Sequence, residues 1–86
     1  MADVYRTEYQ ILLAHLRAAR KEAALTQVQV AHRLNRTQGY VHKIETGERR
    51  MDIVQLMDFC RALDIDFLKF MRTYHHAVIA ALAEKS

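Results

Sequence analysis

The sequence contains no proline, no tryptophan, only two glycines and a single cysteine among its 86 residues. One cysteine, Cys60, cannot close a disulfide within the chain or supply the cysteine pairs of a zinc site. We expect it to be a core thiol, and we expect neither a metal nor a cofactor. The adjacent His75 and His76 do not change this view, because neighbouring helical side chains diverge by about 100°.

Two further absences concern location and catalysis. No apolar run reaches the roughly 18 residues that cross a bilayer, and the first residues lack the basic-then-apolar order of a signal peptide. We therefore expect a soluble cytoplasmic protein. No phosphate loop, nucleophile elbow or paired-carboxylate signature is present, so we do not expect an enzyme.

The apolar residues that are present recur at helical spacing, with little β-branched alternation. This pattern predicts an all-α fold of five helices in a single domain, residues 1–86. The first run lies on one face of a helix ending near Ala23: Tyr5, Tyr9, Leu12, Leu13, Leu16 and Ala19. The fourth run forms a stripe that we expect to face the core: Ile53, Leu56, Met57, Cys60 and Leu63.

Side chains able to cap helices precede the other apolar runs. They are Thr26 (with Gln29 completing a capping box), Thr37, Asp52 and Asp66. The second helix should end at Asn35, which tolerates the left-handed conformation, and the third at Gly47. The fifth should run from about residue 67 to residue 84.

Charge is unevenly distributed along the chain. Residues 15–50 contain eight Lys or Arg against three Glu, whereas the remaining residues contain five positive and seven negative side chains. A basic centre favours a polyanionic partner. Charge alone fits an ordinary solvated surface equally well.

Two short helices joined by about three residues, 35–37, match a helix-turn-helix motif. The helices of this motif cross closely, and Ala31 is small enough to lie at the crossing. Asn35 can bend the chain sharply at the turn. Val41 and Ile44 can anchor the second helix, which leaves its N-terminal outer face exposed.

On these residues and several others, the sequence resembles the lambda-repressor-like family of Cro/CI-type or XRE regulators, over roughly residues 12–70. The matching segments are residues 16–20, 25–27, 30–31, 41, 44–50, 56 and 61–63. Three positions depart from the family pattern. Ala24 and Asn35 stand where glycine is usual, and Met51 where proline is frequent.

The resemblance implies a sequence-specific, double-stranded DNA-binding transcription regulator. We expect a repressor, because the DNA-binding domain and the last helix account for the whole chain. The resemblance also implies a prokaryotic or phage-encoded protein associated with the nucleoid. It also assigns Arg20 and Glu45 to a structural salt bridge; the alternative is that Arg20 binds phosphate.

We expect base contacts from the outer face of the helix over residues 38–45: Gln38, Gly39, His42 and Lys43. The Gln38 amide matches the N6/N7 edge of adenine, which favours a base contact over the alternative of a simple exposed helix start. Lys43 can reach guanine or a phosphate. Gly39 would leave room for the base edges, since glycine otherwise weakens a helix.

We expect phosphate contacts from Gln27 and Thr37 at helix N-termini, and from Arg36, Arg49 and Arg50 in the flanking loops. Tyr40 has two alternatives. Its hydroxyl can bind a phosphate, or its ring can lie against the neighbouring helix.

Apolar residues continue along the fifth helix beyond the family domain, which predicts a homodimer interface. The expected interface residues are Phe70, Tyr74, Ala77, Val78, Ala81 and Leu82. The alternative is that this helix packs back on the first helix beside Tyr5 and Tyr9. A two-fold dimer would match a palindromic operator.

A rival function is a protein-interaction module, such as an antitoxin that neutralises a partner protein, with DNA binding secondary. The long apolar last helix suits that role. Gln38, Lys43 and the flanking arginines favour DNA, because an interaction-only domain would not need them.

Overall fold

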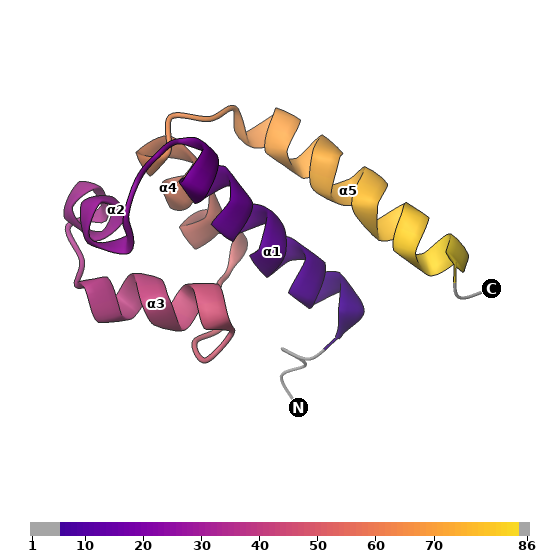
Figure 1. Ribbon diagram of the computed structural model, residues 1–86, viewed down its shortest axis with the longest axis horizontal. Helices are drawn as coiled ribbons and strands as arrows, with labels where there is room; N and C mark the ends of the chain where they lie inside the picture. The colour runs from indigo at the N-terminus through magenta and orange to yellow at the C-terminus, as the bar shows by residue number, and fades with distance from the viewer. Residues whose placement is uncertain (1–5, 85–86) are drawn as a thin grey trace.

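The computed structural model describes residues 6–84, and Tyr5, which was expected on the first helix, lies outside them. Its five helices are α1 (Thr7–Glu22), α2 (Gln27–Leu34), α3 (Gln38–Thr46), α4 (Ile53–Ala62) and α5 (Phe67–Glu84). No strand occurs within residues 6–84, so the predicted all-α fold is confirmed. In Figure 1, α2, α3 and α4 gather at one end of α1, and α5 runs along α1.

Polar side chains begin helices α2, α3 and α4 at the predicted positions. The Thr26 hydroxyl accepts a hydrogen bond from the Gln29 amide, and the Gln29 side chain accepts one from the Thr26 amide. Asp52 and Gln55 form the same reciprocal pair at α4. At α3, the Thr37 hydroxyl accepts from the Tyr40 amide. Each cap satisfies amide groups that lack partners in the first turn of a helix.

Three helices end in a left-handed residue that is not glycine. Ala24, Asn35 and Asp64 have φ angles of 59°, 57° and 59°. In each case the amide of the following residue donates to a carbonyl five residues earlier, as in the Schellman motif: Leu25 to Arg20, Arg36 to Ala31 and Ile65 to Cys60. Asn and Asp tolerate this conformation better than Ala does. Ala24 is therefore the strained member of the three.

The core is formed by residues from all five helices. Side chains that lie at its centre include Leu13, Leu16, Val30, Val41, Ile44 and Phe59. Two members of the predicted α4 stripe face outward instead, since Ile53 and Met57 are 57% and 41% exposed. Phe59, which the predicted stripe did not include, is buried in the core instead. Within residues 6–84, no helix has both the length and the hydropathy of a transmembrane span.

Helix α5 packs against α1 through its N-terminal half. Phe70 is buried in the core, and the Tyr74 hydroxyl donates to the Glu8 carbonyl at 3.0 Å. The Tyr74 ring also makes an edge contact with His15. Phe70 is therefore a core residue instead of the dimer-interface residue expected, whereas the half-buried Tyr74 contacts α1 of its own chain. Helical periodicity identifies an apolar face but not the surface that covers it.

Candidate nucleic-acid interface

The corner between α2 and α3 is tight. Ala31, 3% exposed, belongs to the same core cluster as Val41 and Ile44 of α3, and its carbonyl accepts a hydrogen bond from the Arg36 amide at 2.9 Å. Asn35 turns the chain in the left-handed conformation. A larger residue at position 31 would separate the helices, and the corner fixes the direction in which α3 leaves.

Helix α3 has one buried face and one exposed face. Val41 and Ile44 are fully buried and anchor it to the core. The four residues expected to contact bases all lie on the exposed face: Gln38, Gly39, His42 and Lys43. The polar N-terminal half of a rigidly held helix is therefore presented to solvent.

A buried carboxylate lies behind this exposed face. The Glu45 side chain is 2% exposed, and Arg20 donates to it at 2.6 Å through Nε and at 3.1 Å through Nη2. Arg20 also donates to the Leu25 carbonyl at 2.9 Å. With its guanidinium committed to these acceptors, Arg20 is not placed to bind a phosphate.

Arg17 is a contributor that the sequence did not indicate. Its Nη1 donates to the Glu45 carbonyl at 2.7 Å, which ties α1 to the last turn of α3. The two residues are 28 positions apart, and no local spacing signals a contact over that distance. A cation at the C-terminal end of a helix is favourable because the helix dipole is negative there.

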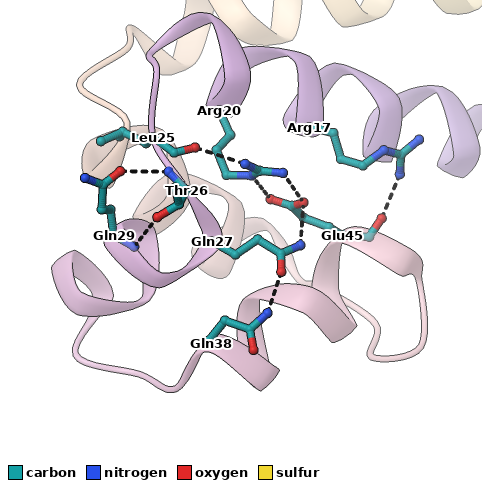
Figure 2. A network of polar contacts seen from close by, with 8 residues as sticks. All are labelled: Arg17, Arg20, Leu25, Thr26, Gln27, Gln29, Gln38 and Glu45. Atoms are coloured by element: carbon teal, nitrogen blue, oxygen red, sulfur yellow. Dashed lines mark hydrogen bonds and ion pairs between the residues drawn. The ribbon is translucent and has the colours of Figure 1, made fainter.

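A chain of side-chain amides connects Glu45 to the start of α3, as Figure 2 shows. The Gln27 Nε2 donates to Glu45 at 3.1 Å, and the Gln38 Nε2 donates to the Gln27 Oε1 at 2.6 Å. Gln27 was expected to contact phosphate and Gln38 a base. The structure brings them into direct contact with each other.

Tyr40 takes a position that serves both of its expected alternatives. Its ring stacks with Phe59 of α4 at a centroid distance of 6.3 Å. Its hydroxyl accepts a hydrogen bond from the Gln55 Nε2 at 3.2 Å. A phenol that accepts one hydrogen bond still has its own proton to donate, so a phosphate contact remains available. Gln55 is a second residue that sequence reasoning missed.

The three flanking arginines lie over aromatic rings. The guanidinium carbons of Arg36 and Arg49 are 4.5 and 5.2 Å from the Tyr40 ring centroid. That of Arg50 is 5.4 Å from the ring centroid of Tyr9. Such contacts restrict the positions that the charged groups occupy.

A positively charged pocket opens beside the N-terminal half of α3. It is lined by Asn35, Arg36, Thr37, Gly39, Tyr40, Lys43 and Arg49. Three of these side chains are cationic and none is anionic. The pocket brings two of the expected base-reading residues, Gly39 and Lys43, together with four of the expected phosphate-binding residues, which suits a polyanion.

Comparison with known proteins agrees with this geometry. Residues 11–67 match a family described as a helix-turn-helix domain. The chain belongs to this helix-turn-helix family. The resemblance to lambda-repressor-like XRE proteins is thereby confirmed, and helix-turn-helix domains of this class bind DNA.

Solved structures share the fold of this helix-turn-helix protein. An XRE-family-like protein from Pseudomonas syringae pv. tomato is 38% identical, with a TM-score of 0.80 over 86% of this chain and 90% of the other. The restriction-modification controller protein C.Esp1396I is 19% identical, with a TM-score of 0.79 over 87% and 97%. The clp gene regulator ClgR from C. glutamicum is 21% identical, with a TM-score of 0.72 over 84% and 94%. A search of curated proteins found no match.

Proposed function

We propose that this helix-turn-helix protein is a sequence-specific transcription regulator that reads the major groove of double-stranded DNA with α3. The observation that carries the proposal is the exposed polar half of α3, bordered by Arg36 and Arg49 and held by a tight corner. An α-helix fits the major groove, where each base pair presents a distinct pattern of donors and acceptors. The regulatory names of C.Esp1396I and ClgR support the same class of role.

Base reading falls to the exposed face of α3. The Gln38 amide can donate to N7 and accept from N6 of adenine. Lys43 and His42 lie one turn further along the helix, where Lys43 can reach guanine or a phosphate. Gly39 directly follows Gln38, and its missing side chain leaves room for the base edges.

Phosphate contacts fall to the residues around this face. The backbone amides at the N-termini of α2 and α3, near Gln27 and Thr37, can bind phosphate oxygens with help from the helix dipoles. Arg36, Arg49 and Arg50 add charge. These groups position the protein without reading sequence.

The protein acts as a homodimer in this proposal, with the C-terminal half of α5 as its interface. Ile79 and Leu82 are 52% and 43% exposed, while Ala77, Val78 and Ala81 are half-buried. Two copies related by a two-fold axis read a palindromic site. In sedimentation experiments we expect Ile79→Lys to yield monomers and the control Leu68→Lys, at the other end of α5, to leave the dimer intact. A wild-type monomer at micromolar concentration, with and without DNA, would refute the dimer.

A bound dimer covers its site and excludes other proteins from it, so we propose repression as the regulatory outcome. A reporter placed behind the selected operator tests the sign. Expression should fall when the wild-type protein is supplied, whereas a rise would show activation.

Binding titrations separate the two kinds of contact. Arg49→Ala or Arg50→Ala should weaken binding to all duplexes alike and reduce the slope of log affinity against log salt by about 1. Gln38→Ala should instead abolish preference at one base position, worth about 1–3 kcal/mol. The control is Arg61→Ala, whose exposed side chain belongs to α4. Unchanged binding in all three interface variants would contradict the proposal.

A further inference from the structure

The polar chain behind α3 has a fixed direction, and that direction begins at Glu45. A carboxylate has only acceptor atoms, whereas a glutamine amide has a donor end and an acceptor end. Arg20 holds the Glu45 carboxylate with two hydrogen bonds, and its burial excludes water as an alternative partner. The Gln27 amide therefore has to turn its NH2 group toward Glu45, as its 3.1 Å contact shows.

This orientation determines what Gln27 presents to α3. With its NH2 group toward Glu45, its carbonyl oxygen faces Gln38 and can only accept. Gln38 accordingly donates through its own NH2 group, at 2.6 Å. The direction of donation thus passes from a buried charge to the first residue of α3.

The remaining groups of Gln38 are the ones available to DNA. One N–H of its amide is engaged by Gln27, which leaves one N–H and the carbonyl oxygen. Among the described residues nothing donates to that oxygen, which points away from Gln27 in Figure 2. A donor beside an acceptor matches N7 and N6 of adenine. If the amide were reversed, an N–H would stand in place of the carbonyl oxygen and face the O6 acceptor of a guanine.

We propose that Glu45 is a positioning residue for sequence recognition, which acts through Gln27 to fix the Gln38 amide in the orientation that prefers adenine to guanine. This inference rests on the proposed function, because it concerns how the same α3 face reads DNA. Glu45 itself does not touch the bases. Its role is exerted entirely through hydrogen-bond direction.

The test compares base preference rather than affinity alone. Duplexes selected by the wild-type protein identify the base pair at which Gln38→Ala loses discrimination. Two probes that differ only there, A·T against G·C, then give a preference ratio for each variant. Gln27→Met removes both hydrogen bonds at nearly constant volume, and we expect the adenine preference to fall about tenfold. The matched control is Gln29→Met. This change removes a capping hydrogen bond of the same helix but no contact with Glu45, Gln27 or Gln38, so it should keep the wild-type ratio.

Glu45→Gln provides the second variant. An amide at position 45 can donate as well as accept, so the Gln27–Gln38 contact can form in either direction and the adenine preference should fall again. Circular dichroism checks that this variant folds. If Glu45→Gln does not fold, the preference ratio of Gln27→Met can still overturn the inference.

The outcomes separate the inference from the proposed function. A wild-type preference for a base other than adenine at the Gln38 position would overturn the inference and leave DNA binding by α3 intact. A Gln27→Met ratio within about twofold of wild type would do the same. Failure of the wild-type protein to bind any duplex would overturn the proposed function and the inference with it.

Discussion

At the scale of single residues, Glu45 is a buried carboxylate at the centre of a polar network. Its carboxylate contacts Arg20 and Gln27, and its carbonyl contacts Arg17. All described buried side-chain nitrogen and oxygen atoms have a hydrogen-bond partner. Removal of one partner from such an arrangement leaves a buried charge without compensation.

Arg20→Ala should therefore lower the free energy of unfolding by up to about 3 kcal/mol, measured by urea denaturation. Arg61→Ala is the matched control, because Arg61 pairs with Asp58 at the surface, with side chains 76% and 49% exposed. That change should stay within about 1 kcal/mol of wild type. Equal midpoints for wild type and Arg20→Ala would show that the buried pair contributes nothing to stability.

Ala24 offers a second prediction at this scale. Its φ of 59° places Cβ in an unfavourable position that glycine would avoid. We expect Ala24→Gly to raise the free energy of unfolding by about 1 kcal/mol. The neighbouring Ala23, at φ −77°, is the control, and Ala23→Gly should lower stability. A loss of stability at both positions would argue against strain at Ala24.

At the scale of the elements, α3 contains a glycine that its own geometry does not require. A Cβ built at Gly39 meets only the Thr37 Oγ1, at an ordinary 3.9 Å. Gly39→Ala should therefore stabilise the helix, by up to about 1 kcal/mol, and at the same time weaken DNA binding. Thermal melts and binding titrations on the same preparation test both halves. Undiminished affinity would show that the bases do not approach position 39.

The sequence predicted where the helices begin better than it predicted which helix faces pack in the core. Capping residues such as Thr26 and Asp52 act within a few residues of themselves, so helix starts could be located from spacing alone. Phe59 and the outward turn of Ile53 could not, because several faces of α4 carry apolar side chains and only packing selects among them. The same holds for Phe70. Spacing predicts that it lies on an apolar face, but not that the core of its own chain buries that face.

The candidate site shows the same division. Exposure of Gln38 and Lys43 follows from their positions outside the face formed by Val41 and Ile44, which local periodicity reveals. The hydrogen bond between Gln27 and Gln38 joins two helices, and the one from Arg17 to Glu45 spans 28 positions. Contacts of that kind depend on how the helices cross, which spacing does not encode.

At the scale of the whole molecule, the core protects Cys60, which is 1% exposed. Burial, with a smaller effect from Asp66, raises the pKa of its thiol from 9.0 to about 11. The folded state thus holds this proton more tightly than the unfolded state does. Its contribution to stability is complete below about pH 9 and is lost as the pH rises toward 11.

Urea denaturation at a series of alkaline pH values checks this effect. The free energy of unfolding of the wild-type protein should fall more steeply above pH 9 than that of Cys60→Ala. Tyr74, whose pKa is also raised by burial, contributes to both proteins and cancels in the comparison. Parallel curves would mean that the thiol titrates alike in the folded and unfolded states.

The dimensions of the molecule, 42 × 29 × 20 Å, also bear on its function. One turn of B-DNA is about 34–36 Å long, so a protomer of this size matches one half-site of the proposed operator. A dimer would then place two α3 helices in successive major grooves on one face of the duplex.

Selection from a random duplex library, followed by sequencing, tests most directly the central claim that α3 reads DNA sequence in a two-fold dimer. We expect enrichment of inverted repeats whose half-site centres lie about 34–36 Å apart, with one base position at which Gln38→Ala shows no preference. No enrichment at low ionic strength, or an identical set of sites from Gln38→Ala and wild type, would contradict it.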